Sequence, residues 1–357
     1  MYIKSVYLEN FRNYKEQNII FCPNINIIYG NNAQGKTNII EAIYLCSLGK
    51  SFRSKKDKEL INFNEQYSKI KINYYKSNRD NSIDFKLDDK KQFLFNDIKQ
   101  NKISEIVGKL NIVTFTPDDI NIIKNGPEER RKFINMMISS LRPKYLHNLN
   151  QYNKVLEERN NLLKQIKENN VNSALLDIYD EQLASLSQEI FLLRNEYIDK
   201  IKEKIEDIHK MITKCGNQEE IKIKYISSGS DKNSYLEAIK KSRNIDIKRG
   251  FSAVGIHRDD IIIYINHKPV NIFGSQGQQR TAVLSLKLCE LQIVKEEVGE
   301  SPVLLLDDFM SELDIKRRNS FLENIKDCQV ILTCTDEIEL NAKQKIFYVN
   351  NGKVEEV

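Results

Sequence analysis

An eight-residue segment near the start of the chain has the residue types needed to bind a polyphosphate. Residues 30–37 fit the pattern G-x-x-x-x-G-K-[ST]. The glycines let backbone N–H groups turn inward around a β-phosphate, and the helix that follows offers the positive end of its dipole. We expect Lys36 to reach the β- and γ-phosphates and Thr37 to bind Mg²⁺. The expected ATP contacts are therefore the residues of this cradle: Gly30, Asn31, Asn32, Ala33, Gln34, Gly35, Lys36 and Thr37.

A short apolar segment near the end of the chain supplies a second element of such a site. Residues 303–306 read Val-Leu-Leu-Leu and are followed by Asp307 and Asp308. We expect Asp307 to bind Mg²⁺ and Asp308 to polarise the attacking water, which makes Lys36, Asp307 and Asp308 the expected catalytic residues. The segment alone could equally be a core strand followed by a helix cap, but its pairing with the cradle favours the functional interpretation.

A third segment, residues 274–280, precedes an apolar helix expected from about residue 276 to 294. Ser275 stands where an N-cap would, Gly277 leaves backbone amides open, and Gln278 follows. Such a helix start can bind a second anion. Taken by itself, the segment could also be a capped helix and nothing more.

These motifs need a fold that places them, and the chain reads as three parts. The first 110 residues read as strands with one early helix, in an antiparallel meander. Apolar steps of three and four over 143–167 and 173–213 predict two long paired helices. The last third returns to alternating strands and helices and ends in a hairpin with an Asn-Gly turn. We therefore predict an ATPase domain built from residues 1–120 and 251–357, with an inserted helical arm over 121–250.

Composition limits the classes of function that fit. The chain has 357 residues, of which 40% are hydrophobic and 29% charged, as in soluble proteins. No run of 18 apolar residues and no signal peptide is visible, so we expect a cytoplasmic protein without a membrane span. Six cysteines form no C-x-x-C pair and favour buried, reduced thiols over a zinc site. The net charge of +5 permits nucleic acid as a partner without requiring it.

The order of the motifs resembles the ABC-type ATPases. The cradle, the S-x-G-Q-Q segment, the apolar strand with two aspartates, and Ser-Glu-Leu-Asp at 311–314 look like the Walker A, signature, Walker B and D-loop motifs. The resemblance implies an α/β fold with a mixed sheet, an antiparallel β lobe and an inserted helical arm. It also implies that the signature of one subunit completes the nucleotide site of another. About 270 residues separate Lys36 from Asp307, which favours an SMC-like head over a transporter subunit.

A closer resemblance covers the whole chain and points to the RecF family of bacterial recombination mediators. It rests on six segments in order, at 8–14, 49–53, 115–119, 126–133, 152–163 and 255–260. This resemblance implies ATP-dependent homodimerisation on single- and double-stranded DNA at junctions or gaps, with slow, DNA-stimulated hydrolysis. It further implies help in recombinase loading, other recombination mediator proteins as partners, and roles in repair, replication and the SOS response. Arg12 and Asn13, within the first segment, are added to the expected nucleotide contacts.

Two departures from the ABC pattern affect the chemistry. Asp308 stands where many ABC enzymes have Glu, and its shorter side chain is consistent with slow turnover. Residues 333–336 read Thr-Cys-Thr-Asp where transporters have a switch histidine. The sequence does not place a Q-loop glutamine. His257 could be functional or could be a buried, hydrogen-bonded histidine.

Other functions and the DNA contacts stay open at this stage. The alternatives are another ABC-type ATPase, either a transport subunit or an SMC-like chromosome protein, and a small-molecule P-loop kinase. Membrane transport is disfavoured by the inserted helices, and the kinase leaves the signature without a role. For DNA phosphates we expect the basic run at 50–58 and the side chains of Arg130, Arg131 and Lys132.

Overall fold

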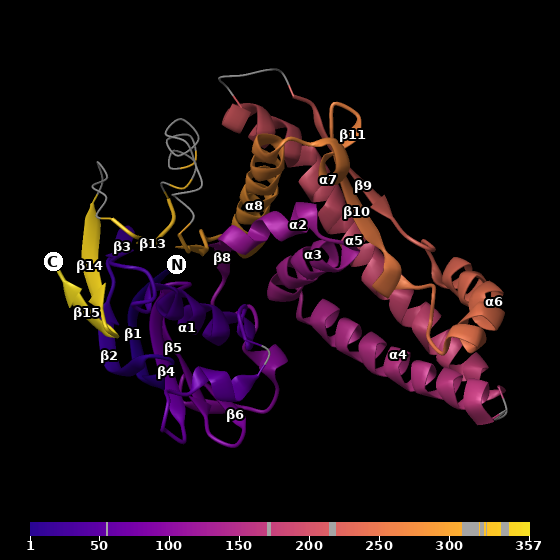
Figure 1. The fold of residues 1–357 in the computed structure, drawn as a ribbon, viewed down its shortest axis with the longest axis horizontal. Helices are drawn as coiled ribbons and strands as arrows, with labels where there is room; N and C mark the ends of the chain where they lie inside the picture. The colour runs from indigo at the N-terminus through magenta and orange to yellow at the C-terminus, as the bar shows by residue number, and fades with distance from the viewer. Residues whose placement is uncertain are drawn as a thin grey trace. The chain divides into compact units, whose positions relative to one another are not determined.

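The computed structural model describes residues 1–54, 56–169, 173–213, 219–308, 321, 325, 327–336 and 343–357 (Figure 1). Two compact units divide the chain. Met1–Asp119 together with Glu290–Val357 form one unit, called the head here, and Ile120–Cys289 form the other, called the helical unit. We expected the insertion to end at residue 250. Residues 251–289 instead group with the helical unit, because the strand over Asp260–Ile265 pairs with the strand over Ile221–Ile226.

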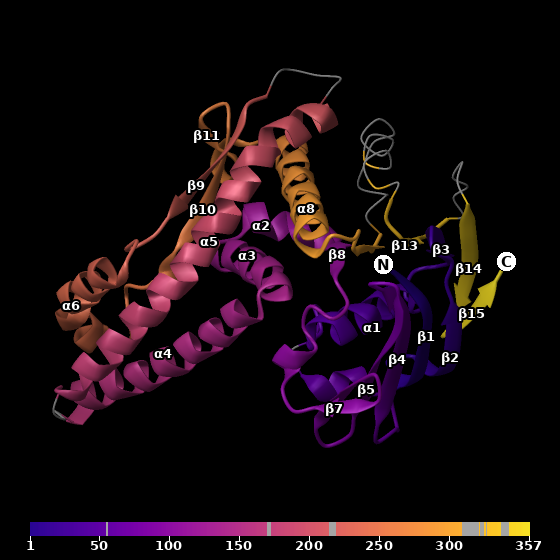
Figure 2. The same ribbon diagram turned by 180° about the vertical axis from the view of Figure 1, so that it is seen from behind.

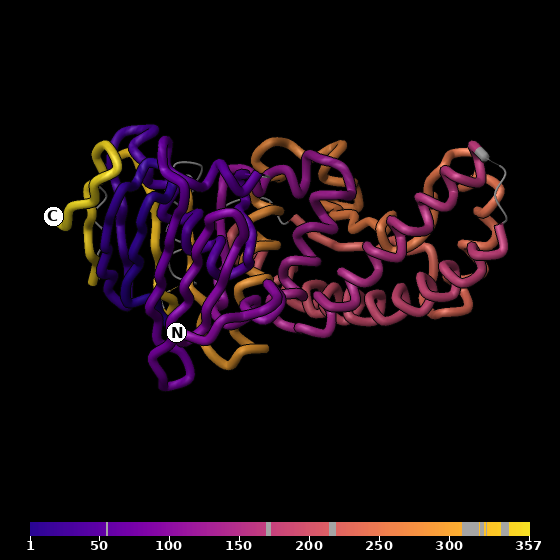
Figure 3. The backbone as a smooth tube through the Cα atoms, turned by 90° about the horizontal axis from the view of Figure 1, so that it is seen from below, coloured from indigo at the N-terminus to yellow at the C-terminus, as the bar shows by residue number. Residues whose placement is uncertain are grey.

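The head contains an antiparallel sheet whose strands lie one beside another (Figure 3). Alternate side chains of the third strand, including Ile70, Ile72 and Tyr74, are buried, as the period-two pattern predicts. The meander predicted for the first 110 residues is confirmed for these strands. In spatial order the strands are β2 (Tyr14–Ile20), β1 (Tyr2–Phe11), β4 (Ser68–Lys76), β5 (Arg79–Leu87), β6 (Lys91–Phe95) and β7 (Ile98–Gln100).

A second sheet of the head combines strands from both ends of the chain. Its central strands are parallel and mostly apolar, because both faces are covered. In spatial order they are β15 (Lys353–Glu356), β14 (Gln344–Asn350), β3 (Ile25–Tyr29), β13 (Val330–Cys334), β12 (Val303–Leu306) and β8 (Ile112–Phe115). Helix α1 (Lys36–Leu48) follows β3 and ends at Gly49, whose φ of 72° is readily adopted by glycine. The short 3₁₀ segments are η1 (Asp57–Leu60), η2 (Ile103–Glu105) and η3 (Pro117–Ile120).

The helical unit contains the two long helices that the apolar spacing predicts. Helices α4 (Pro143–Asn169) and α5 (Leu175–Thr213) lie side by side (Figures 1 and 2). At 1.5 Å per residue, α5 is roughly 60 Å long. The remaining elements are α2 (Asn121–Lys124), α3 (Pro127–Leu141), α6 (Lys232–Arg249), η4 (Ile256–Arg258), α7 (Val270–Phe273) and a sheet of β9 (Ile221–Ile226), β10 (Asp260–Ile265) and β11 (Lys268–Pro269). Helix α8 (Gln276–Val298) begins in this unit, and the division falls within it.

Candidate nucleotide-binding site

The cradle forms the turn between β3 and α1 in the head, as the sequence predicts. Gly30 has a φ of 148° and Gly35 a φ of 114°, both left-handed values that favour glycine. Each also lacks room for a side chain: a Cβ on Gly30 would lie 2.4 Å from the Val349 carbonyl oxygen, and one on Gly35 would lie 2.5 Å from Asn13 Nδ2. Because Gly35 precedes the first residue of α1, the backbone N–H groups at the start of that helix face the turn.

Lys36 lies inside this turn and is held there by neutral groups. Its side chain is buried, with 7% of the residue's surface exposed. The ammonium donates to the carbonyl oxygens of Gly30 at 2.6 Å and Asn31 at 2.9 Å. A phosphate could replace or join these partners and would supply the negative charge that the carbonyls lack. The arrangement therefore fits the role predicted for Lys36.

The carboxylate of Asp307 meets the cradle at the end of β12. Its Oδ1 accepts hydrogen bonds from Thr37 Oγ1 at 2.9 Å and from Thr333 Oγ1 at 2.8 Å. Burial raises the pKa of Asp307 above its ordinary value, and the two threonine hydroxyls partly oppose that rise. A cation placed here would favour the charged carboxylate. Hydroxyl and carboxylate oxygens are the ligand atoms that Mg²⁺ prefers, so Thr37 and Asp307 fit the predicted metal site.

Thr333 is a site residue that the sequence reasoning did not identify. Leu306 of β12 is paired with Leu332 of β13, so the residues that follow each of them end at the same edge of the sheet. The Thr333 hydroxyl donates to Asp307 and accepts the Asp308 backbone N–H at 2.9 Å. It therefore connects the two aspartates, and the parallel register of β12 and β13 is the signal that could have revealed it. Asp308 has a φ of 49°, and its role toward water stays a prediction.

The turn between β1 and β2 places Arg12 and Asn13 beside the cradle. Asn13 Nδ2 donates to the Gln34 carbonyl oxygen at 2.8 Å, and its Oδ1 accepts from Asn38 Nδ2 at 2.8 Å. Arg12 donates through Nε and Nη2 to the two carboxylate oxygens of buried Glu41, at 2.9 and 2.7 Å. Asn13 thus contacts the cradle directly, whereas Arg12 is joined to helix α1 through Glu41.

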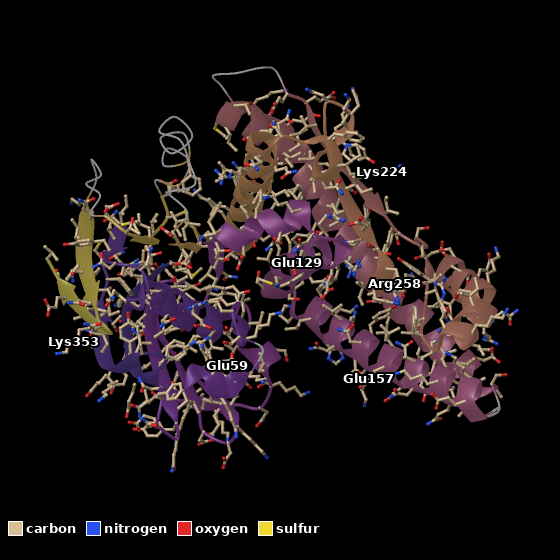
Figure 4. All side chains as sticks on the ribbon, viewed as in Figure 1. Glu59, Glu129, Glu157, Lys224, Arg258 and Lys353 are labelled. Carbon is tan, nitrogen blue, oxygen red and sulfur yellow. The ribbon has the colours of Figure 1, made fainter. Side chains whose placement is uncertain are left out.

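A cavity of about 1400 Å³ opens next to this turn. Arg12, Asn13 and Asn38 line it, so a nucleotide in the cradle would have space beside it. Glu59, labelled in Figure 4, is among the acidic residues of the lining. The basic lining residues are Arg12, Arg53, Lys56, Lys58 and Lys86.

Arg53 is a second site residue that we did not predict from the sequence. It belongs to the basic run at 50–58 that we assigned to DNA. In the structure its Nη1 donates to Asn38 Oδ1 at 2.9 Å, one residue beyond Thr37, and lies 4.0 Å from the Glu41 carboxylate. Its positive charge also lowers the pKa of Asp307, against the larger effect of burial. Arg53 therefore lies at the nucleotide site, whatever else the run contacts.

The signature segment lies in the helical unit and begins α8. Ser275 Oγ accepts the Gln278 backbone N–H at 3.2 Å, while Gln278 Oε1 accepts the Ser275 N–H at 2.9 Å. This reciprocal pair is a capping box, so the predicted N-cap role of Ser275 is confirmed. Gln278 Nε2 also donates to Glu219 at 2.9 Å, and Gly277 lies in the first turn of the helix. The contact of this segment with a nucleotide stays a prediction, and the D-loop at 311–314 lies outside the described residues.

Two expectations for the basic and histidine residues change. Arg130 cannot be a DNA contact, because it is buried and donates to both oxygens of Asp260 at 2.6 and 3.0 Å. Arg131 donates to the Asp259 carbonyl oxygen at 2.7 Å, whereas Lys132 is exposed.

For His257 the structure favours the structural interpretation: Nδ1 lies 2.7 Å from the Tyr152 hydroxyl and Nε2 lies 3.1 Å from the Ser252 carbonyl oxygen. Burial lowers its pKa to about 4.

Comparison with known proteins gives the family. The family model described as the RecF/RecN/SMC N terminal domain matches residues 2–355. The "DNA replication and repair protein RecF" of Clostridium perfringens (strain SM101 / Type A) is 46% identical over 365 residues, covering 99% of this chain and 100% of that protein. This chain belongs to the RecF family. The resemblance predicted from the motifs is thereby confirmed.

Solved structures agree with this assignment. Structures of the recombination mediator protein RecF with ATPrS and with ATP match with TM-scores of 0.93 and 0.92. Their identities are 39% and 38%, and the matches cover all of this chain and 98% and 97% of those chains. An SMC head domain from Pyrococcus furiosus, at 18% identity, shares the fold with a TM-score of 0.58 over all of this chain and 96% of its own. The predicted fold, an ABC-type head with a helical insertion, is confirmed. Among the helices that the structure describes, none has the length and apolar character to cross a lipid bilayer.

Proposed function

We propose that this RecF-family chain is an ATP-dependent DNA-binding protein of recombinational repair and replication-fork maintenance. The observation that carries the proposal is the hydrogen bond between Thr37 and Asp307, which joins the cradle to the end of β12. It brings together the two motifs that a P-loop ATPase needs, although they lie at opposite ends of the chain. The names of the related RecF proteins, which include DNA repair and ATP, support the same function. They favour it over transport, SMC-like chromosome and kinase roles.

ATP and Mg²⁺ are the proposed ligands of the head. The Lys36 ammonium would bind the β- and γ-phosphates in place of the carbonyls it now contacts. Thr37 and Asp307 would hold Mg²⁺, which supplies charge neutralisation between the two phosphates when it is bound. Asp308, next to Asp307, would orient the attacking water. Its short side chain is consistent with slow hydrolysis, and we propose that DNA stimulates this hydrolysis and that it acts as a switch.

Homodimerisation is the proposed consequence of ATP binding. The start of α8 presents Ser275, which is exposed, and the backbone N–H groups of the first helical turn beside Gly277. In our proposal this helix start binds the γ-phosphate of a nucleotide held by a second copy. Hydrolysis would then remove the anion that joins the two copies and release the dimer.

DNA is the proposed macromolecular partner, at single-strand and double-strand junctions or gaps. The basic run at 50–58 and Lys132 remain candidate phosphate contacts after the loss of Arg130, and Lys56, Lys58 and Lys132 are exposed. Recombination mediator proteins are the proposed protein partners, with recombinase loading during the SOS response as the outcome. These roles place the protein in the cytoplasm.

Light scattering with and without Mg-ATP tests the dimer. We expect the mass to double on addition of Mg-ATP. Ser275→Arg should abolish this doubling while ATP still binds, because the larger cation blocks the helix start. Ser230→Arg is a matched control, since Ser230 is an exposed serine of the same unit that lies outside the signature. An unchanged mass with and without ATP in the unmodified protein would contradict the proposal.

A salt series of DNA-binding measurements tests the DNA partner. If lysines contact phosphates, the logarithm of the association constant falls linearly with the logarithm of the salt concentration, with a slope near −0.9 for each phosphate in double-stranded DNA. Replacing Lys56 and Lys58 together should reduce the slope by about 2 if both are contacts. Lys36→Met should remove the dependence of DNA affinity on ATP. DNA affinity that responds neither to ATP nor to salt would exclude an ATP-controlled electrostatic clamp.

A further inference from the structure

The C-terminal hairpin contacts the cradle from outside the nucleotide site. Strands β14 and β15 are joined by Asn351 and Gly352, with φ values of 48° and 72°, the two left-handed values of a type I′ turn. The Asn351 N–H donates to Gln34 Oε1 at 2.6 Å, and the Gly352 N–H donates to the Gln34 carbonyl oxygen at 3.3 Å. Lys353, labelled in Figure 4, marks the start of β15 just after this turn. One cradle residue therefore bonds both residues of the C-terminal turn.

The Gln34 carbonyl receives two donors on this outer side. Asn13 Nδ2 donates to it at 2.8 Å, in addition to the Gly352 N–H. In a trans peptide the carbonyl oxygen and the following N–H point in opposite directions. Donors that bind the Gln34 carbonyl from outside therefore turn the Gly35 N–H toward the inside of the loop. The Tyr14 hydroxyl acts in the same way on the next peptide, by donating to the Gly35 carbonyl oxygen at 3.0 Å.

The hairpin packs closely against the cradle at Gly30 and against the neighbouring Asn13. A Cβ on Gly352 would lie 2.5 Å from the Asn13 carbonyl oxygen, and a Cβ on Gly30 would lie 2.4 Å from the Val349 carbonyl oxygen. The hairpin is also fixed on its far strand. The Gln17 side-chain amide donates to the Val354 carbonyl oxygen and accepts its N–H, both at 3.1 Å, as a neighbouring strand would. A shift of the turn would therefore be transmitted to the cradle.

We propose that the Asn351–Gly352 turn and Gln34 are positioning elements for nucleotide binding. Through Gln34, the Asn351–Gly352 turn orients the cradle N–H groups toward the phosphates without itself touching the nucleotide. The inference rests on the proposed ATP site and adds the last seven residues of the chain to its supporting structure. It makes ATP affinity dependent on a turn that sequence motifs would assign only to the fold.

Replacing Gly352 by Ala tests this inference, with Gly299→Ala as the matched control. Both glycines belong to the head and have nearly the same φ, 72° and 75°, so both variants carry the same left-handed strain. A Cβ on Gly299 meets nothing within 4 Å, whereas the one on Gly352 meets the Asn13 carbonyl oxygen. A difference between the two variants therefore reports the close contact of the turn with Asn13, which is itself hydrogen-bonded to the cradle at Gln34.

We expect Gly352→Ala to raise the KM and the Kd for ATP about tenfold, the loss of roughly one hydrogen bond. The kcat should stay within about twofold, because cradle N–H groups bind the β-phosphate alike in the ground and transition states. Gly299→Ala should leave all three within about twofold. Gln34→Met, which removes the acceptor of the Asn351 N–H, is a second variant in case Gly352→Ala does not fold, and it should weaken ATP binding several-fold.

Isothermal titration with ATP and steady-state hydrolysis provide the readouts, and thermal unfolding without nucleotide shows whether each variant is folded. ATP binding by both Gly352→Ala and Gln34→Met within twofold of the unmodified protein would overturn the inference. So would a loss in kcat with KM unchanged. If the unmodified chain itself fails to bind ATP, the proposed function fails instead, so the two results are distinguishable.

Discussion

In the helical unit, the buried arginines Arg159 and Arg194 pair with carboxylates, whereas in the head the buried Lys36 and Asp307 are held by uncharged groups. Arg159 is fully buried and lies 2.7 Å from Asp180 and 2.8 Å from Asp246. Arg194 lies 3.2 Å from Asp259, which also accepts from the Tyr225 hydroxyl at 2.5 Å. These charges are balanced within the protein itself.

Lys36 and Asp307 of the head are held differently, although the head also contains the charged pair of Arg12 and Glu41. Lys36 donates to two carbonyls, and Asp307 accepts from two threonine hydroxyls. Hydrogen bonds satisfy these groups, but no opposite charge takes part in them. A buried charge with only neutral partners costs free energy that an oppositely charged ligand can recover. The difference distinguishes Arg159 and Arg194, whose charges are neutralised within the fold, from Lys36 and Asp307, whose charges a bound ligand can neutralise.

The largest expected effect is on the stability of the helical unit. Arg159→Met leaves Asp180 and Asp246 buried without this arginine, and we expect the free energy of unfolding to fall by about 3–5 kcal/mol. Arg243→Met is the matched control, because Arg243 pairs with the same Asp180 but its side chain is 25% exposed; a loss of about 1 kcal/mol is expected there. Urea unfolding measures both. Equal losses in the two variants would show that burial does not distinguish these pairs.

A somewhat smaller effect should follow from acidification, through His257. Burial, and then the charges of Arg258, Arg131 and Arg159, lower its pKa from 6.5 to about 4, against a hydrogen bond to Ser252. Between these pH values the unfolded chain binds the extra proton. The free energy of unfolding therefore falls as the pH is lowered from 6.5 to 4. Over this whole range, His257 accounts for a loss of about 3 kcal/mol.

Urea unfolding from pH 7 to pH 4 should reveal this, with His257→Gln as the comparison. Glutamine can still bond the Tyr152 hydroxyl but does not titrate. The difference in stability between the two proteins should shrink or reverse as the pH falls, while other groups titrate alike in both. Parallel curves would mean that His257 is not the group responsible.

The smallest of the three effects concerns the head and should appear in binding. Lys36→Met removes the charged donor to the phosphates, so we expect ATP affinity to fall by about 1.5–3 kcal/mol, roughly 10- to 150-fold. The free energy of unfolding without nucleotide should change by about 1 kcal/mol or less, because the buried ammonium and its hydrogen bonds are lost together. Lys99→Met, at an exposed position of β7, is the control. A large loss of stability in Lys36→Met would place Lys36 with the structural charges.

The parts of the site that the sequence predicted are those whose signal is local. The cradle and Ser275 each lie where a turn meets a helix, and Asp307 directly follows an apolar strand. Local residue types specify such element ends. Thr333 and Arg53 were missed because their roles depend on strand register and on a loop folding back toward α1. Such contacts between distant residues leave no pattern in a single sequence.

Two errors have the same origin. Arg130 was assigned to DNA because basic neighbours suggest a surface patch, but its partner Asp260 lies 130 residues further along the chain. The second domain boundary was placed at 250/251 because residues beyond it read as alternating strands and helices. The pairing of β9 with β10, which ties residues 260–265 to the helical unit, is again a long-range contact.

The position of β3 has a consequence for the order in which the molecule can be completed during synthesis. This strand precedes the cradle, and its two neighbours are β13 and β14, which begin at Val330 and Gln344. At 5–20 residues per second, a ribosome needs roughly 15–60 s to make the intervening chain. During that time β3 has both edges unpaired, whereas the helical unit is contiguous and all its residues emerge earlier. The nucleotide site is thus among the last parts of the nascent chain to form, and a truncated product should expose an unpaired apolar strand.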